Sequence, residues 1–358
     1  MNDPRNKQLA KILVDYSVKT KKGDKIVITC TSFLGLPLAE EVYKLILLKE
    51  AFPHFQLQTE SLSYLYFKHA TRDQLRAEPE IAQFLAGWGD KFITIVAEQN
   101  PKELANIDPV KQVLRSKAIK KSRDQIMKKP WMVTYYPTAG MAYASEMSLH
   151  ELEDLYFSAC LKDWRKESEN LQRLKLILDK SKKFRIIGFK TDLSMDFTGR
   201  FFAICAGEYN MPDGEIFGAP LEDSVNGQVY FDFPSIYHGK EVRGLTLIFK
   251  KGKVVSWSAD NHREFLNHIL NTDPGARRLG EVGIGTNFSI TRFMSNTLFD
   301  EKMGGTVHLA LGAAFKERIE GRGENDSAIH WDLIKDLRKK DSKIIVDDKI
   351  ILKDGKIL

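Results

Sequence analysis

Apolar residues in the first half of the chain follow two alternating spacings. Between residues 4 and 20 they recur at the three- and four-residue intervals of a helix, whereas residues 25–30, KIVITC, form a run rich in β-branched side chains. A second helical pattern covers residues 38–48, and further strand-like runs cover residues 55–59 and 91–96. Strands that alternate with helices through short turns indicate βαβ units. We therefore expect an α/β N-terminal domain with a mainly parallel sheet and flanking helices.

Short β-type runs dominate the second half of the chain. They lie at residues 183–189, 192–197, 201–206, 228–233, 242–249 and 253–258. A long helical stretch, residues 148–180, precedes them with an interruption near Asp163, and residues 262–271 give the one clear helical pattern among them. We predict two domains, 1–182 and 183–358, of which the second is an α+β, strand-rich domain.

Composition adds the expected setting of the protein. With 358 residues, of which 43% are hydrophobic, the chain can bury a sizeable core. The N-terminus has no apolar targeting segment behind a basic start, and no apolar run is long enough to span a membrane, so we expect a cytoplasmic protein with no membrane partner. Cys30, Cys160 and Cys205 are far apart in apolar contexts, which is typical of reduced core residues. The turn after residues 25–30, TSFLG, matches no nucleotide-binding motif, so we expect no nucleotide.

Positive charge is concentrated in residues 111–129. This segment contains eight basic residues and a single acid, Asp124, although the whole chain has a formal net charge of only +6. A basic helix could bind phosphates, which makes a nucleic-acid-binding protein one alternative. Aromatic residues for base stacking are not interleaved with the basic ones. A solvated helix face, or a rim that attracts acidic peptides, therefore explains the segment better, and we do not expect a nucleic-acid partner.

Candidate metal ligands are concentrated between residues 279 and 332. The stretch contains carboxylates and imidazoles among glycines and β-branched residues, at Glu281, Asp300, Glu301, His308, His330 and Asp332. Carboxylate oxygen and neutral imidazole suit Zn²⁺, Co²⁺ or Mn²⁺. Because the stretch has no cysteine, a structural zinc site built on thiolates is excluded here.

Each of these signals has a simpler alternative. Asp332 also opens a helical pattern, DLIKDLRKK, and taken alone is better explained as an N-cap than as a ligand. On an extended segment, however, His330 and Asp332 would leave from the same face. His308, inside the apolar run TVHLALG, would by itself be interpreted as a buried core histidine. Glu281 is harder to dismiss, because a carboxylate on an apolar strand is costly to bury without a partner.

A further carboxylate, Glu215, follows a turn at NMPDGE. Pro212 and Gly214 predict a tight turn, and Glu215 then begins a short apolar strand. A placed carboxylate and a solvated acid on a surface turn are both compatible with this pattern.

Five sequence blocks in order carry a resemblance to a known family. They are NMPDGE, AP-x-E-D-S-V-x-G, TD-x-GARRLGE-x-GIGTN, LFDEK-x-GGT-x-HLALG and SAIHWD. Together they resemble the thermophilic aminopeptidase (aminopeptidase T) family of metallo-exopeptidases. The resemblance implies a metal-dependent aminopeptidase that removes N-terminal amino acids from peptides by water activated by two metal ions in the C-terminal domain. It also implies a homodimer.

The resemblance further implies a set of site residues. The implied metal ligands are Glu215, Glu281, Glu301, His308, His330 and Asp332, which would hold two divalent ions. Glu281 and Glu301 are the candidates for catalytic proton transfer. Asn287 and Asp300 are candidates for orienting the ligands.

One position departs from the family pattern. Phe315 stands where related chains have a tyrosine that helps to stabilise the reacting carbonyl oxygen. Loss of one such donor typically lowers turnover by about 10²- to 10³-fold. Tyr209 or Tyr237 could replace the donor, and a catalytically weak or inactive metal- or peptide-binding relative stays open as an alternative.

Overall fold

The computed structural model describes residues 3–100, 102–237, 239–314 and 323–358. Two compact units make up the chain: the first combines residues 1–162 with 207–212, and the second combines residues 163–206 with 213–358. The predicted division after Lys182 assigns residues 163–182 to the N-terminal domain, whereas the compact units assign them to the strand-rich unit. The assignment of residues 183–358 to one domain stays a prediction.

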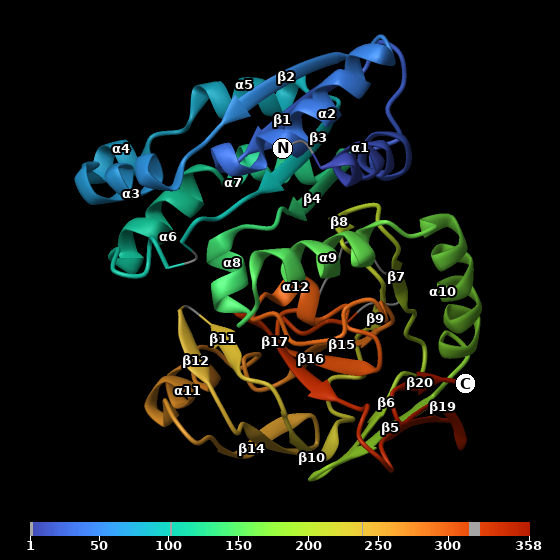
Figure 1. The fold of residues 1–358 in the computed structure, drawn as a ribbon. Coiled ribbons are helices and arrows are strands. Elements are labelled where there is room, and N and C mark those ends of the chain that lie inside the picture. Colours follow the sequence, from blue (N-terminus) through green and yellow to red (C-terminus); the bar gives the residue numbers. More distant parts are fainter. Residues whose placement is uncertain (1–2, 101, 238, 315–322) are drawn as a thin grey trace. The chain divides into compact units, whose positions relative to one another are not determined.

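The first unit is built on a five-stranded parallel sheet in the order β2-β1-β3-β4-β8 (Figure 1). Its strands are β1 (Lys25–Cys30), β2 (Phe52–Leu57), β3 (Lys91–Val96), β4 (Trp131–Tyr135) and β8 (Asn210–Met211). Its helices are α1 (Pro4–Lys11), the π-helix η1 (Ile12–Ser17), the 3-10 helix η2 (Phe33–Gly35), α2 (Leu36–Leu48), α3 (Glu60–His69), α4 (Arg72–Arg76), α5 (Glu80–Trp88), α6 (Pro109–Ala118), α7 (Lys120–Met127), α8 (Ala139–Ala144) and α9 (Leu149–Cys160). The predicted α/β class with a mainly parallel sheet is confirmed.

The basic segment 111–129 forms two helices rather than one. Several of its side chains bind backbone carbonyl groups near the C-terminal ends of other helices. Lys111 donates to Phe67, and Arg115 donates to Ala77. Lys129 donates to Ala86. Cations at these positions satisfy carbonyl groups that a helix end leaves unpaired, so part of the segment's charge has a structural use.

The second unit is strand-rich. An eight-stranded sheet has the order β14-β13-β10-β6-β5-β18-β19-β20, and a five-stranded sheet has the order β17-β16-β15-β9-β7. The elements of the larger sheet are β5 (Lys183–Gly188), β6 (Thr191–Asp196), β10 (Asn226–Tyr230), β13 (Thr246–Lys250), β14 (Lys253–Ser258), β18 (Lys343–Val346), β19 (Lys349–Lys353) and β20 (Lys356–Ile357). The smaller sheet contains β7 (Ala203–Cys205), β9 (Glu215–Gly218), β15 (Leu279–Gly285), β16 (Thr306–Gly312) and β17 (His330–Asp336). The remaining elements are the hairpin β11 (Ser235–Tyr237) with β12 (Lys240–Val242), and helices α10 (Trp164–Leu178), α11 (Arg263–Leu270) and α12 (Thr297–Asp300).

Helix boundaries in both units follow local capping chemistry. Ser148 and Glu151 form a capping box at the start of α9, and the Asp163 side chain accepts the Lys166 N–H at the start of α10. The interruption predicted near Asp163 is therefore the junction of these two helices. Within the part of the chain that is described, no helix combines the length and the apolar character needed to cross a membrane.

Candidate metal centre

The five-stranded sheet of the second unit places the candidate residues at its centre. All seven residues of β15 and all seven of β16 are buried. Apolar side chains account for most of this burial, but Glu281 lies on β15 and His308 lies on β16. Charged groups at such positions are withdrawn from water and need partners within the protein.

The register of this sheet brings the charged side chains onto one face. His308 is paired with Gly283, and Ala310 lies between Glu281 on one neighbouring strand and Asp332 on the other. A Cβ atom on Gly283 would overlap the imidazole of His308. Small residues at positions 283 and 310 therefore leave room for the two acids and the histidine between them.

His308 connects two of the predicted carboxylates. Its Nε2 atom lies 3.0 Å from Glu281 Oε1 and 3.6 Å from Glu215 Oε2. Glu281, His308 and Asp332 each offer one possible ligand atom, and these three atoms lie within 4.8 Å of one another. The structure thus brings together residues from three separate sequence blocks.

Glu215 reaches this cluster from the first position of β9, directly after Gly214. Gly214 has a φ of +117°, a conformation that glycine adopts without steric cost, and Glu215 is only 4% exposed. The side-chain amide of Asn287 donates a 2.8 Å hydrogen bond to the carbonyl group of Asp213. Glu215 begins a short strand, as predicted, and the alternative of a solvated acid on the surface is wrong.

Glu301 joins the cluster through a lysine. Lys302 is 1% exposed, and its Nζ atom lies 2.6 Å from Glu215 Oε1 and also binds Glu301 Oε1. Glu301 is the residue that immediately follows α12, whose N-cap is Asn296. One buried ammonium group therefore links two of the predicted ligands.

His330 and Asp332 lie on β17, and the N-cap alternative for Asp332 is wrong. Residues 330–336 pair along their length with β16, so the two side chains point to the same face. His330 Nδ1 lies 2.8 Å from the carbonyl oxygen of Ala313, and His330 Nε2 lies 3.5 Å from Asp332 Oδ1. Donation from Nδ1 to a carbonyl fixes the ring and leaves Nε2 on the side of the cluster.

Burial and mutual charge shift the pKa values of the acids. Burial raises the pKa of Glu281 above its usual range, although the hydrogen bond with His308 opposes this shift. Burial also raises the pKa of Glu301 to about 8, against the opposing charge of Lys302. Burial opposes ionisation of Asp332 as well, but its interaction with His330 outweighs burial and lowers the pKa. Neighbouring carboxylates in this cluster therefore differ in their affinity for a proton.

The carboxylates of the cluster raise the pKa values of its three cationic side chains, His308, His330 and Lys302. Burial lowers the pKa of His308 and His330, but their carboxylate partners outweigh burial and raise these pKa values to about 9 and about 10. Burial opposes the charge of Lys302 too, yet Glu215 and Glu301 raise its pKa well above the usual value. The carboxylates of the cluster thus stabilise the charged forms of the three cationic side chains among them.

Several buried atoms of this cluster have no hydrogen-bond partner among the described residues. They are Glu215 Oε2, Glu281 Oε2, His308 Nδ1 and Asp332 Oδ1. Buried polar atoms without partners are rare in proteins and need an explanation. Carboxylate oxygens and imidazole nitrogens that converge in a buried site are the donor set of Zn²⁺, Co²⁺ and Mn²⁺, so these residues fit divalent metal ions.

The candidates outside the cluster have different positions. The Asp300 carboxylate accepts the backbone N–H groups of Met294 and Asn296 and so organises the loop before α12. Tyr237 stacks on Trp331, and its hydroxyl group interacts with the backbone of His330, so this tyrosine lies beside the cluster. Tyr209 belongs to the first unit, and Phe315 lies outside the described residues.

Sequence reasoning missed three residues of this site. Lys302 stands in the quoted motif FDEK, but hydropathy gives no sign that a lysine is buried. Cys205 and Asp213 lie close to Glu215, with one candidate ligand atom of each within 4.8 Å of one another. The apolar context of Cys205 predicts only a core residue. The position of Asp213 in the motif NMPDGE, two residues before Glu215, is the feature of the sequence that indicates it.

A comparison with protein-family models decides the family. The model described as Thermophilic metalloprotease (M29) matches residues 2–356. The chain belongs to this metalloprotease family. Membership confirms the predicted resemblance and, together with the aminopeptidase names of the relatives, the prediction of a hydrolase of the exopeptidase type.

Individual metalloprotease relatives agree with this assignment. Aminopeptidase 2 of Geobacillus stearothermophilus is 30% identical over 331 residues, which cover 78% of this chain and 79% of the relative. Aminopeptidase AmpS of Bacillus subtilis is 26% identical and covers 91% and 90% of the two chains. The solved structure of AmpT from Thermus thermophilus shares the fold, with a TM-score of 0.87, 22% identity and 99% coverage of both chains. The predicted combination of a parallel α/β region with a strand-rich region is confirmed by this fold.

Proposed function

We propose that this chain is a metal-dependent aminopeptidase that removes single amino acids from the N-terminus of peptides. The buried cluster on β15, β16 and β17 carries the proposal, because its carboxylates and imidazole converge and one atom each of Glu281, His308 and Asp332 has no hydrogen-bond partner among the described residues. The family and the names of its relatives support the reaction class.

We propose a site for two divalent metal ions, Zn²⁺, Co²⁺ or Mn²⁺. The residues that would hold them are Glu215, Glu281, Glu301, His308, His330 and Asp332. Such ions, when bound, lower the pKa of a coordinated water molecule and polarise a peptide carbonyl group. The carboxylate distribution supports two positions, because Glu281 and Asp332 flank His308 while Glu215 and Glu301 meet at Lys302.

We propose that Glu281 or Glu301 transfers the proton. Glu281 is buried and the side chain of Glu301 is 16% exposed. Withdrawal from water raises the pKa of each carboxyl group above its usual range, that of Glu301 to about 8. A carboxylate with such a pKa can accept a proton from the attacking water and return it to the leaving amine. The negative charge of the cluster also favours a substrate with a free amino group at its N-terminus, which would restrict cleavage to the first residue.

Release of free amino acids from defined peptides tests this function. The protein is stripped by a chelator, reloaded separately with Zn²⁺, Co²⁺ or Mn²⁺, and mixed with unblocked and N-acetylated forms of the same dipeptides and tripeptides. We expect metal-dependent release from the unblocked peptides alone. Cleavage of the acetylated forms would contradict an aminopeptidase, and metal-independent cleavage would contradict a metal-dependent one.

A catalytically weak or inactive relative is the second candidate, because Phe315 replaces the tyrosine expected at that position. This candidate predicts stoichiometric metal binding without peptide cleavage, and recovery of turnover in Phe315→Tyr. We do not propose a nucleic-acid-binding function, since Lys111, Arg115 and Lys129 are engaged by carbonyl groups of the chain itself.

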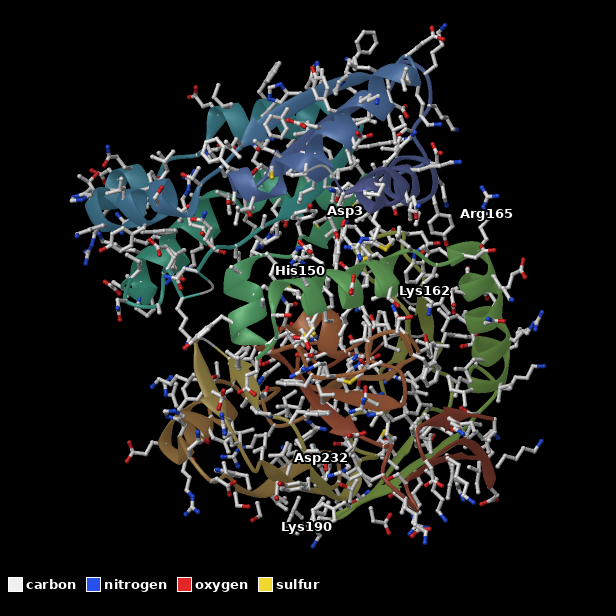
Figure 2. The ribbon with its side chains drawn as sticks, in the orientation of Figure 1. Asp3, His150, Lys162, Arg165, Lys190 and Asp232 are labelled. Atoms are coloured by element: carbon white, nitrogen blue, oxygen red, sulfur yellow. The ribbon has the colours of Figure 1, made fainter. Side chains whose placement is uncertain are left out.

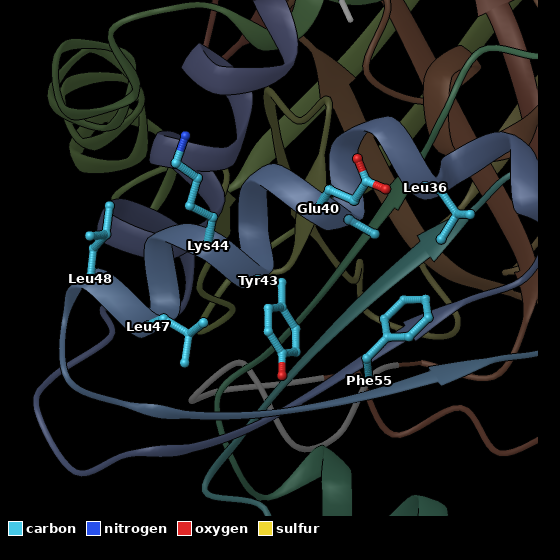
Figure 3. Close-up of a pocket in the computed structure, with 8 residues that line it drawn as sticks. Leu36, Glu40, Tyr43, Lys44, Leu47, Leu48 and Phe55 are labelled. Atoms are coloured by element: carbon cyan, nitrogen blue, oxygen red, sulfur yellow. The ribbon is translucent and has the colours of Figure 1, made fainter.

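We also propose a homodimer, which the exposed face of α2 supports. Leu47 is 53% exposed and Leu48 is 70% exposed on this helix, beside a groove of about 660 Å³ (Figure 3). Glu40 and Lys44 lie on the same face. An antiparallel pair of α2 helices about a two-fold axis would place Glu40 opposite Lys44 of the second copy, and Leu36 opposite Leu48. Light scattering should show a dimer that Leu48→Glu dissociates; a monomeric wild type would contradict this proposal.

We propose a cytoplasmic location because the three cysteines are free thiols. Cys30, Cys160 and Cys205 are buried thiols, and such thiols are typical of reducing compartments. Fractionation of the native cells with an antibody against the chain tests this location, and recovery outside the cytoplasm would contradict it.

A further inference from the structure

Lys302 is a cation in the interior of the second unit. Its side chain is 1% exposed, and its ammonium group binds Glu215 Oε1 at 2.6 Å and Glu301 Oε1. An ammonium group has three donors. Two of them are used by carboxylates from distant parts of the sequence, both of which are proposed metal ligands.

A second buried lysine in the same unit gives a comparison. Lys335 is 0% exposed and donates to Asp232 at 2.6 Å and to the carbonyl group of Phe189 at 3.1 Å; Asp232 is labelled in Figure 2. Asp232 also pairs with Lys339. The carboxylate that receives Lys335 therefore belongs to a structural ion-pair network, whereas both carboxylates that receive Lys302 belong to the metal cluster.

Lys302 contacts only one of the two carboxylate oxygens of Glu215. Oε1 accepts from the ammonium group, whereas Oε2 has no hydrogen-bond partner among the described residues and lies 3.6 Å from His308 Nε2. Fixing one oxygen of a carboxylate fixes the direction of the other. Lys302 thus determines how Glu215 presents its second oxygen to the cluster.

The backbone of Lys302 is anchored to the turn that carries Glu215. Its carbonyl group accepts a 2.9 Å hydrogen bond from the backbone N–H of Asn287, and the side chain of Asn287 donates to the carbonyl group of Asp213. The ammonium group therefore extends from a segment whose position relative to Glu215 is held by hydrogen bonds. Such support from outside the ligand set typically changes metal affinity by about 10- to 100-fold.

We propose that Lys302 is a positioning residue that sets Glu215 and Glu301 as a ligand pair for one of the two metal ions. This inference rests on the proposed function. Lys302 acts through the two carboxylates. The alternative is a counter-charge that only offsets the excess of acids. The two roles predict opposite results, because removing a nearby positive charge without any loss of geometry would strengthen the binding of a cation.

Metal binding by Lys302→Met distinguishes these roles. The chelator-stripped wild type, Lys302→Met and the matched control Lys335→Met are titrated with Zn²⁺ by calorimetry, and bound metal is counted after dialysis. We expect two ions in the wild type and in Lys335→Met. In Lys302→Met we expect one ion with near-normal affinity and a loss of at least about tenfold in affinity for the other.

The remaining outcomes separate this inference from the proposed function. Equal or tighter binding of both ions by Lys302→Met would overturn the positioning role and leave the metal site intact. A wild type that binds no divalent ion would overturn the proposed function and this inference with it. If Lys302→Met does not fold, as judged by circular dichroism, Lys302→Gln replaces it. The neutral amide of glutamine cannot bind the two carboxylates as strongly as the ammonium group of Lys302 does. The affinity for the same ion should therefore fall, and unchanged affinity would again overturn the proposal.

Discussion

His308 and Gly283 face each other across β15 and β16, and the imidazole of His308 occupies the space where a Cβ atom on Gly283 would stand. The ring reaches Glu281 over this glycine, at 3.0 Å from Nε2 to Oε1. The packing of a proposed ligand therefore requires a glycine at position 283.

Gly283→Ala should displace the imidazole of His308, because both central strands are buried and the backbone has little room to shift. We expect the affinity for Zn²⁺ to fall by at least about tenfold, with a parallel loss of peptide cleavage. Calorimetry on chelator-stripped protein measures this change. The control is Gly87→Ala on α5, where an added Cβ would meet only the end of the Gln125 side chain at ordinary contact distance. Normal metal affinity in Gly283→Ala would show that the position of His308 does not matter.

Glu281→Gln should lower turnover by about 10²- to 10⁴-fold, because the amide cannot accept and return a proton. The substitution preserves size and leaves an oxygen toward His308, so circular dichroism should show an unchanged fold. Glu264→Gln on the exposed side of α11 provides the control. Turnover within about threefold of the wild type would exclude a catalytic role for Glu281.

Asn287→Ala should loosen the connection between the Glu215 turn and the Lys302 segment. Loss of the hydrogen bond to the carbonyl group of Asp213 should cost about 0.5 to 1.5 kcal/mol of stability. Urea unfolding measures this cost, and metal titration should show weaker binding. Asn267→Ala, at an exposed position on α11, should leave both quantities unchanged. A stability loss without weaker metal binding would restrict Asn287 to a structural role.

Stability should depend on pH through Asp273. Burial opposes its charge, but hydrogen bonds from the backbone of Ala328 and the side chain of Ser327 outweigh burial and lower its pKa. A carboxyl group whose pKa is lowered by folding stabilises the native state above its unfolded pKa. That contribution disappears as the pH falls through the folded pKa.

Asp273→Asn should therefore reduce the free energy of unfolding by about 1 to 3 kcal/mol near pH 7. The difference from the wild type should shrink as the pH is lowered below about 4. Urea unfolding at several pH values provides the comparison, with the exposed Asp341→Asn as control. A difference that stays constant with pH would contradict the role of the charge.

Much of the fold was predictable from local pattern. The β-rich run KIVITC is β1, and the capping residues Ser148 and Asp163 begin helices where the pattern placed them. The break between α6 and α7 was missed, because lysine and arginine favour helix throughout the segment and Ile119 gives no breaking signal. At DLIKDLRKK, pairing with β16 outweighed a helical spacing.

The site was predictable only as a set of residue types. Glu281 and His308 carried a signal because each is a polar residue within an apolar run. Their convergence depends on which of the strands pair with one another, and a local pattern does not show which distant segments become neighbours in a sheet. Burial of Lys302 follows from the same pairing, which explains why a lysine beside a recognised glutamate was overlooked.

The most direct test of the central claim is a metal titration followed by its effect on peptide cleavage. Chelator-stripped protein receives Zn²⁺ in steps, and the rate of amino acid release from one unblocked tripeptide is measured at each ratio of metal to chain. We expect no cleavage by the stripped protein, activity that saturates at about two ions per chain, and activity at least about 10²-fold lower at every ratio in Glu281→Gln. Full cleavage by the stripped protein, or saturating metal binding without any cleavage, would contradict the central claim.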